Sequence, residues 1–349
     1  MSLRRTAAAQ RRNTRSTTRR TTTALAVGAA AALALAACSD AEGEDSGDGE
    51  VEIDSVEIIV PADPGGGWDQ TGRTMQSEMQ DNDIVGDAQV VNVGGAGGTV
   101  GLAQLATATN ENTLMVMGYV MVGAIETNQS ETTLEDVTPI ARLTEEPLVV
   151  VVPAESEYET IQDLTDDIIA NGQDVSVTGG SAGGVDHILA AQLLTEAGMD
   201  PADVAGALNY IPYSGGGESL AALLGNNVDA GISGVAEYAE QVNAGTLRAL
   251  AVSSEEPSPA LPDTPTLIDQ DVDLVLTNWR GVVAPGNIDD AQAEALTQLV
   301  TEMHDADSWA DALEANNWDD AFLAGDEFAT FLEEDIESVR QTLTDIGLV

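Results

Sequence analysis

Glycine-rich clusters directly follow two apolar, strand-like runs in the first third of this chain, and each cluster precedes a helix-like pattern. Pro64–Gly67 follows Val56–Val60, and Gly94–Gly98 follows Gln89–Val93. In such a corner, a strand, a glycine turn and a helix start aim backbone N–H groups at an anion, which the helix dipole also favours. Two corners this close in the sequence predict a pocket for a small anionic ligand.

Two further glycine clusters occupy equivalent positions later in the chain. They are Gly179–Gly184, after Val175–Val177, and Tyr213–Gly217, after Tyr210–Pro212. A tight turn without a ligand would explain any one cluster taken alone. Because ligands of open α/β sheets bind outside the carboxyl ends of the strands, four clusters favour one shared cleft.

Short apolar runs alternate with amphipathic stretches, which predicts an α/β fold. Strands are expected at 56–60, 89–93, 113–118, 148–152, 174–178, 208–212, 228–232, 247–253 and 274–284. Helices are expected at 69–80, 99–108, 160–171, 185–198, 216–225, 235–244, 289–304, 307–315 and 326–346. The spacing indicates two lobes with a cleft between them. We expect lobe 1 over 51–146, lobe 2 over 147–272, and a hinge return into lobe 1 over 273–349.

The first 37 residues differ sharply from the remainder. They hold seven of the 12 basic residues and no acidic residue, and they end in the apolar stretch Ala24–Ala37. This stretch is too short to span a bilayer as a stable helix, so residues 1–37 are expected to form a lipoprotein signal peptide. Arg19 and Arg20 leave the choice between general secretion and twin-arginine export open.

Cys38 is the only cysteine, and it follows small residues at the end of the apolar stretch. This arrangement resembles the bacterial lipobox, in which the cysteine is lipidated and becomes the mature N-terminus. The alternatives are a free cysteine near an ordinary cleavage site and an uncleaved signal anchor. A single cysteine excludes a disulfide within the chain. Residues 38–50 are acidic and lack large apolar side chains, so they are expected to form a flexible tether.

The charge of the chain argues against nucleic acid as a partner. All basic residues are arginine, and only five of them follow the signal, against 60 acidic residues. Nucleic-acid binding needs a basic patch for the phosphates, so we expect none. A salt-tolerant, solvated surface explains the excess of acids.

The residue types offer little for catalysis. A phosphate-binding loop needs a lysine, which is absent, and Gly94–Gly98 fits the dinucleotide pattern only loosely. His187 is expected to hydrogen-bond to backbone at a helix end, with a base or ligand role as the alternative. We expect no catalytic residue, no cofactor and no metal, although the many carboxylates leave a metal site open.

Several motifs, in order, resemble one known family, the substrate-binding proteins of tripartite tricarboxylate transporters. Pro61–Arg73 is similar to the first loop of this family, and Asn92–Gly101 is similar to the second. Later motifs of the family are matched by Pro212–Gly217, Leu223–Ala230 and Asn278–Gly281. The resemblance extends over residues 55–349. It implies a periplasmic-binding-protein fold of type II, whose two α/β lobes close over a carboxylated solute.

The resemblance also implies the ligand contacts. The first two loops would hold one carboxylate, largely through backbone amides and bridging waters. The residues expected to bind ligand are Pro64, Gly65, Gly66, Trp68, Asp69, Gly95, Ala96, Gly97, Gly98, Gly180, Ser181, Tyr213 and Arg280. One departure is Asn226-Asn227, where the family carries a second glycine and a histidine. We therefore interpret that segment as structural.

Few cations remain to attract an anion, so backbone dipoles must supply most of the positive potential. Arg280 is the best candidate for a direct cationic contact; the alternative is an ion pair or stacking on Trp279. Arg73 is expected to pair with an acid. Trp68 either touches ligand or shields the pocket and packs under the loop.

The function expected from the sequence is therefore that of a monomeric solute-binding lipoprotein on the outer face of the cytoplasmic membrane. It would capture a di- or tricarboxylate, citrate first, by hinge closure and deliver it to a two-component membrane permease. Two alternatives remain: a sensor that presents the ligand to a membrane kinase, and an enzyme on the same two-lobed fold.

Overall fold

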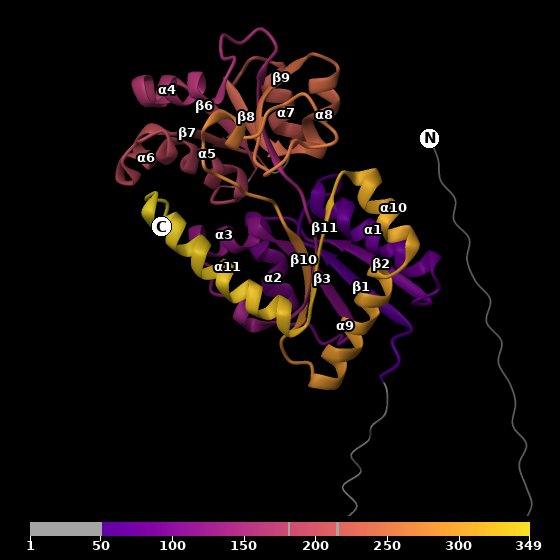
Figure 1. Cartoon of the computed structure of the whole chain (residues 1–349). Helices are drawn as coiled ribbons and strands as arrows, with labels where there is room; N and C mark the ends of the chain where they lie inside the picture. The colour runs from indigo at the N-terminus through magenta and orange to yellow at the C-terminus, as the bar shows by residue number, and fades with distance from the viewer. Residues whose placement is uncertain (1–50, 181, 214–215) are drawn as a thin grey trace, which may run out of the picture. The chain divides into compact units, whose positions relative to one another are not determined.

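The computed structural model describes residues 51–180, 182–213 and 216–349. These residues belong to one unit that begins at Gly49. The predicted signal peptide over 1–37, the predicted lipidation site Cys38, the predicted tether over 38–50 and the predicted site residue Ser181 lie outside the described residues. The described part is an α/β structure with two separate sheets (Figure 1).

The larger sheet has six strands in the order β11-β4-β10-β3-β1-β2. Its strands are β1 (Ser55–Val60), β2 (Asp87–Asn92), β3 (Thr113–Gly118), β4 (Val137–Glu145), β10 (Arg280–Pro285) and β11 (Asp319–Ala324). β1 is parallel to both β2 and β3, whereas β10 is antiparallel to β3 and to β4. Every residue of β3 is buried, as expected for a central strand that is covered on both faces.

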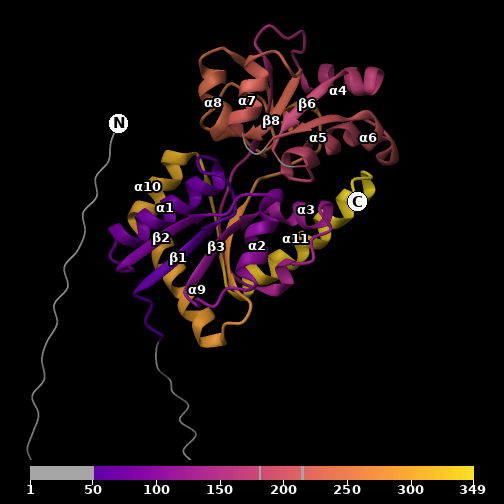
Figure 2. The same cartoon turned by 180° about the vertical axis from the view of Figure 1, so that it is seen from behind.

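Six α-helices pack with this sheet, and we call the assembly the first lobe (Figure 2). They are α1 (Gly67–Asp81), α2 (Thr99–Leu105), α3 (Tyr119–Thr127), α9 (Asp290–His304), α10 (Asp307–Asn316) and α11 (Asp326–Asp345). The buried side of α1 carries Met75 and Met79, which are fully buried. Such apolar faces hold the helices on the sheet.

The smaller sheet has five strands in the order β7-β6-β8-β5-β9. They are β5 (Leu148–Pro153), β6 (Ser176–Gly179), β7 (Asn209–Pro212), β8 (Ala230–Gly234) and β9 (Leu247–Val252). β6 is parallel to β7 and β8, and β5 is antiparallel to β8 and β9. The apolar run Leu148–Val152 is buried throughout, as expected for a strand that is covered on both faces.

The helices of this second assembly, which we call the second lobe, are α4 (Ile161–Asn171), α5 (Val185–Glu196), α6 (Pro201–Ala207), α7 (Gly216–Leu224) and α8 (Val235–Asn243). Short 3-10 helices are η1 (Ala96–Gly98), η2 (Leu134–Asp136), η3 (Gly172–Asp174) and η4 (Ile268–Gln270).

Among the described residues, none of the helices is both long enough and apolar enough to cross a lipid bilayer.

Two segments connect the lobes and lie side by side. Pro147 forms an antiparallel bridge with Thr277. The N–H of Glu146 donates to the carbonyl of Asn278 at 3.2 Å, and the N–H of Asn278 donates to the carbonyl of Glu146 at 2.8 Å. The strand predicted over 274–284 was therefore wrong in its first part. Residues 274–279 form one crossing segment, Glu146 and Pro147, between β4 and β5, form the other, and the strand β10 begins only at Arg280.

Two strands and two α-helices were not predicted from the sequence. The strands β4 and β11 occupy one side of the first-lobe sheet, and the helices α3 and α6 lie in regions that were expected to be irregular. Of these, α3 matters most for function, because it begins where β3 ends.

Candidate functional site

The first two glycine corners lie together at one edge of the first-lobe sheet. The loops after β1 and β2 leave from neighbouring parallel strands, so they emerge at the same carboxyl edge. They also touch, because a Cβ added at Gly94 would lie 2.6 Å from Oδ1 of Asp63 in the first loop. Corner one leads into α1, and corner two leads through η1 into α2.

Asp69 holds the first loop in place. Its Oδ2 accepts the N–H of Gly65 and the Nε–H of Arg73, each at 2.9 Å, and its Oδ1 accepts Nδ2 of Asn92 at 2.8 Å. Burial alone would raise the pKa of Asp69, but these hydrogen bonds and the charge of Arg73 outweigh burial and lower it. Both oxygens are engaged within the protein, so Asp69 positions the loop. The expectation that Arg73 pairs with an acid is confirmed.

The second loop has an unusual backbone. The φ angles of Gly95, Ala96, Gly97 and Gly98 are all positive, at 134°, 50°, 62° and 93°. The N–H of Gly98 closes a turn onto the carbonyl of Gly95 at 3.0 Å. Within the described part of the chain, no acceptor is found for the N–H groups of Gly95, Ala96 and Gly97. Free N–H groups on successive residues of a loop are suited to an anion.

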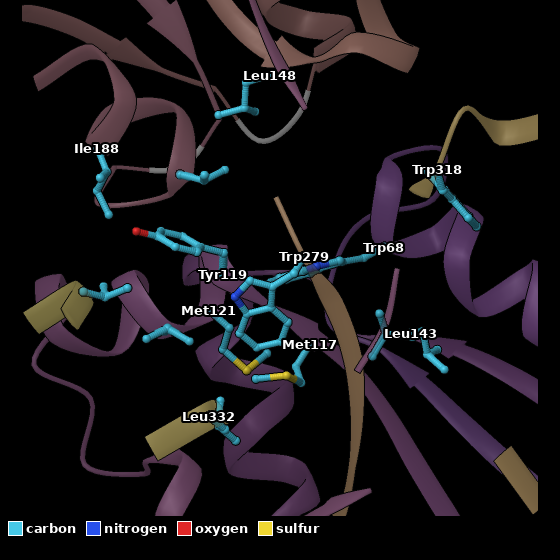
Figure 3. Packing of buried hydrophobic residues seen from close by; sticks show 14 of the residues in the cluster. Trp68, Met117, Tyr119, Met121, Leu143, Leu148, Ile188, Trp279, Trp318 and Leu332 are labelled. Carbon is cyan, nitrogen blue, oxygen red and sulfur yellow. The ribbon is translucent and has the colours of Figure 1, made fainter. Parts of the chain in front are cut away.

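Trp68 packs beneath this second loop. It is 9% exposed, and a Cβ added at Gly98 would lie 2.8 Å from its Cζ3 and 2.7 Å from Cε of Met121. Of the two roles left open by the sequence, the described contacts of Trp68 are those of packing under the loop. Figure 3 shows Trp68 and Met121 among the buried side chains here, with Met117 and Met121 pointing toward Trp279.

Arg280 lies at the same edge of the sheet as the first two corners. β10 runs antiparallel to β3, so its first residue pairs with Gly118 at the end of β3. The guanidinium lies against the start of α1, because a Cβ added at Gly67 would lie 2.6 Å from Nη2. Three backbone N–H groups at this helix start, those of Gly67, Trp68 and Asp69, have no intrahelical acceptor. A side-chain cation and a helix N-terminus therefore meet at one point.

The guanidinium of Arg280 is buried and only partly paired. Nη2 donates to Oε1 of Glu146 in the crossing segment, and the side chains are 4% and 3% exposed. The guanidinium carbon also lies 5.5 Å from the ring centre of Trp318. Nη1 is buried, and the described residues offer it no hydrogen-bond partner. An orphaned, buried cationic N–H is costly, and a ligand anion would satisfy it.

The third corner belongs to the second lobe and is tied down by polar side chains. The N–H of Gly180 donates to Oδ2 of Asp186 at 2.6 Å, and its carbonyl accepts the hydroxyl of Tyr210 at 3.1 Å. The N–H of Gly183 donates to Nδ1 of His187 at 3.1 Å, and the His187 ring stacks on Tyr210 at 4.1 Å. The backbone role expected for His187 is confirmed. Burial lowers the pKa of His187 to about 4, so the ring is neutral at pH 7.

The fourth corner follows β7, which is parallel to β6, so it leaves the same sheet edge as the third. The N–H of Tyr213 donates to the carbonyl of Gly179 at 3.0 Å, which joins the two corners. Its side chain is partly buried against the second-lobe core. Gly217 has open space where a side chain would stand.

Contacts between the lobes occur where α3 meets the third corner. Oγ1 of Thr127 donates to the carbonyl of Ala182 at 3.4 Å. A Cβ added at Gly123 would overlap the carbonyl oxygen of Gly183. The third corner is thereby placed against the first lobe. Sequence reasoning missed α3 and so missed this contact.

Three carboxyl groups interact electrostatically in this region, and sequence reasoning singled out none of them. They are Glu146, Asp186 and Glu237. Burial raises the pKa of Glu146, although Arg280 lowers it. Burial also raises the pKa of Asp186, to about 7; Glu237 and Glu146 raise it further, whereas the hydrogen bond from Gly180 and the charge of Arg280 lower it. One sequence signal could have identified Asp186: it is an acidic residue in the first turn of a helix that follows a glycine corner.

Other features of the described residues do not offer a competing site. In that part of the chain, no group of three or more His, Cys, Asp and Glu side chains is placed to hold a metal ion. A hollow of about 520 Å³ lies near the start of β4, at the other end of the sheet from Arg280, and its lining includes Glu131, Glu135 and Asp136. Those acids would repel a carboxylate.

Comparisons with known proteins show which sequences this chain resembles. A sequence model of the tripartite tricarboxylate transporter family receptor matches residues 73–348. BugT of Bordetella pertussis is 27% identical over 299 residues, which cover 84% of this chain and 89% of that protein.

Solved structures share the two-lobed fold. MatC from Rhodopseudomonas palustris with bound malate has a TM-score of 0.69 at 21% identity, covering 83% of this chain and 98% of that one. A protein of R. palustris with adipate has a TM-score of 0.74 at 18% identity, covering 84% and 97%.

Proposed function

This chain belongs to the tripartite tricarboxylate transporter receptor family, and from that premise we propose that it captures a di- or tricarboxylate, with citrate as the first candidate. It does so outside the cytoplasmic membrane, by closing its two lobes over the ligand. No bond is made or broken. The malate and adipate named for the two solved relatives are dicarboxylates, which supports a ligand of this class.

The observation that carries the proposal is the buried Nη1 of Arg280, which has no partner among the described residues. It lies in a guanidinium that meets the N-terminus of α1. One ligand carboxylate would accept from Nη1 and from the N–H groups of the first two corners. Hydrogen bonds from a cation to a carboxylate are among the strong ones. The ligand residues expected from the sequence in corners one and two, Pro64 to Asp69 and Gly95 to Gly98, enter this proposal as loop backbone, with Trp68 and Asp69 supporting it.

From the second lobe, Gly180, Ser181 and Tyr213 are proposed to complete the site. Support for this comes from the contacts between α3 and the third corner, which bring that corner to the first lobe. Closure over the ligand would then exclude water and strengthen each polar contact.

The test is calorimetry of the purified protein with a panel of mono-, di- and tricarboxylates. We expect binding of citrate or a dicarboxylate and no binding of acetate. The variant Gly97→Asp adds a negative charge to the second loop and is expected to abolish binding with folding kept. Gly206→Asp, at an exposed position in α6 with open space around it, is the matched control and is expected to bind normally. No heat with any carboxylate would contradict the proposal, as would full affinity in Gly97→Asp.

We propose in addition that Cys38 carries a lipid that holds the protein at the outer face of the membrane. Mass spectrometry of the mature N-terminus tests this, with Cys38→Ser as the control that should appear in the soluble fraction. Delivery to a two-component permease is tested by uptake of radiolabelled citrate into cells with and without the receptor gene. Binding with unchanged uptake would instead favour the sensor alternative.

A further inference from the structure

The region around Arg280 is anionic before any ligand arrives. Arg280 is the cation that acts on Asp186, and it already donates to Glu146. Asp186 lies within electrostatic reach of Arg280, Glu146 and Glu237, so Asp186 and Glu237 add two more carboxyl groups to this region. A site with this balance would repel the dianion or trianion that the proposed function assigns to it.

Asp186 is the group best placed to relieve this repulsion. It is 7% exposed and belongs to the first turn of α5, directly after the third corner. Its Oδ2 accepts the N–H of Gly180, a residue proposed to contact ligand. Burial and its acidic neighbours raise its pKa to about 7.

The titratable and charged groups that face Asp186 come from five elements. They are Glu146 in the crossing segment, Arg280 in β10, Tyr210 in β7, Glu237 and Tyr238 in α8, and the neighbouring His187 in α5. Both tyrosines have a raised pKa, so they stay neutral, and His187 has a lowered pKa, so it stays neutral as well. Glu146 also has a raised pKa, but it accepts from Arg280, which favours its ionised form, so the carboxyl of Asp186, with a pKa of about 7, is the better candidate to change its charge near pH 7.

We propose that the receptor takes up a proton together with its carboxylate ligand, and that Asp186 is the residue that accepts it. This inference rests on the proposed function. The ligand brings a negative charge to the orphaned Nη1 of Arg280, and the added charge makes the proton on Asp186 more tightly held. Protonated Asp186 still accepts from Gly180 through one oxygen, and its other oxygen becomes a donor.

The linkage has a definite sign. Because the complex binds more protons than the free protein, affinity falls as pH rises above the pKa of Asp186 in the free protein, by at most about tenfold for each pH unit. Below about pH 6 Asp186 is protonated in both states, and its contribution to the pH dependence disappears. Release of the ligand is therefore favoured by alkaline conditions.

The experiment is calorimetry of the full mature protein with citrate at pH 8, in buffers that differ in their enthalpy of ionisation. The dependence of the measured heat on that enthalpy gives the number of protons taken up. At this pH the carboxyl groups of the ligand are ionised, since their pKa values lie well below 8. We expect more than about half a proton per ligand, because Asp186, with a pKa near 7, is about nine-tenths ionised in the free protein at pH 8 and the charge of the ligand is expected to raise that pKa above 8.

Asp186→Asn separates the proton from the hydrogen bonds, because an amide accepts and donates as a protonated carboxyl does. We expect this variant to take up no proton and to bind at pH 8.5 at least as tightly as the wild type. Asp335→Asn is the matched control: Asp335 is also buried with a raised pKa, but it hydrogen-bonds to Trp279 on the side of α11. Its proton uptake should equal that of the wild type.

The outcomes are distinct. Binding of citrate without proton uptake by the wild type overturns this inference and leaves the proposed function standing, whether or not the variant folds. Unchanged proton uptake in Asp186→Asn also overturns it, because another group then takes the proton. Absence of binding to every carboxylate is the failure of the proposed function itself.

Discussion

The guanidinium of Arg280 donates to the carboxylate of Glu146 inside the protein, where the two side chains are 4% and 3% exposed. Arg280 begins β10, and Glu146 lies in the crossing segment just after β4. The pair therefore joins the sheet of the first lobe to the segment that leads into the second. Gly234 at the start of α8 lies against the same carboxylate, since a Cβ there would approach Oε2 of Glu146 to 3.0 Å.

Removal of one partner of this pair should harm the protein more than removal of both. Arg280→Met leaves the Glu146 carboxyl buried and unpaired, which is expected to lower the free energy of unfolding by about 3–5 kcal/mol. Replacing both residues by methionine removes the unpaired charge and should recover most of that loss. Urea unfolding measures the stabilities, and calorimetry should find ligand binding abolished in both. A double variant less stable than Arg280→Met would contradict this account.

Gly98 in the second loop and Gly66 at the start of α1 should respond differently to alanine. At Gly98, φ is 93° and the added methyl group would meet Trp68 and Met121, so Gly98→Ala is expected to cost about 1–3 kcal/mol. At Gly66, φ is −91° and nothing lies within 4 Å of the added Cβ, so Gly66→Ala should cost less than about 1 kcal/mol. Thermal unfolding of both variants tests this. Equal losses would mean that the close packing under the second loop does not govern its stability.

The glycine corners could be predicted from the sequence because their signal is local. A strand, a glycine run and a helix start are read within a short stretch, and parallel strands bring such corners to one edge. The Arg280–Glu146 pair could not be read in this way. It depends on the register of β10 with β4, in which Arg280 pairs with Thr144, a residue far away in the sequence.

The helix α3 was missed for a different reason. Six of its residues, Tyr119, Met121, Val122, Gly123, Ala124 and Ile125, are buried, so the segment has no polar face. The period of 3.6 residues that identifies a surface helix is therefore absent, and the β-branched residues favour a strand. β11 was missed because its first residues, Asp319 and Asp320, are acidic and exposed, which is tolerated at the edge of a sheet.

Contact between the lobes should depend on the absence of a side chain at Gly123. A methyl group there would overlap the carbonyl oxygen of Gly183, so Gly123→Ala is expected to keep α3 and the third corner apart. We expect affinity for citrate to fall at least about tenfold, because closure over the ligand is opposed by the overlap. The matched control is Gly206→Ala, also within a helix but with open space around it, which should bind normally. Normal affinity in Gly123→Ala would show that this contact is not part of the closed state.

Asp335 should make the folded protein less stable as pH rises, whereas a carboxylate in an ordinary ion pair makes it more stable. Burial raises its pKa to about 6, against 3.8 as the usual value, although Trp279 and Arg142 lower it. The folded state therefore holds this proton more tightly than the unfolded state, and stability is lost as pH rises from about 4 to about 6. The full shift corresponds to at most about 3 kcal/mol. Asp335→Asn keeps an acceptor for Nε1 of Trp279 and does not titrate, so its stability relative to the wild type should increase between pH 4 and pH 7.5.

Asp163 supplies the control with the opposite sign. Its Oδ2 accepts the N–H groups of Glu159 and Thr160 at 3.0 Å and 2.9 Å, and these bonds lower its pKa. Above the pKa that Asp163 has in the unfolded state, its carboxylate therefore stabilises the folded protein. This stabilisation is lost as pH falls through the pKa that Asp163 has in the folded state. The stability of Asp163→Asn relative to the wild type should therefore change below about pH 4 and stay nearly constant between pH 4 and pH 7.5, where that of Asp335→Asn increases. Urea unfolding of the three proteins at both pH values measures the two differences, and a difference for Asp335→Asn that does not change with pH would contradict the assignment.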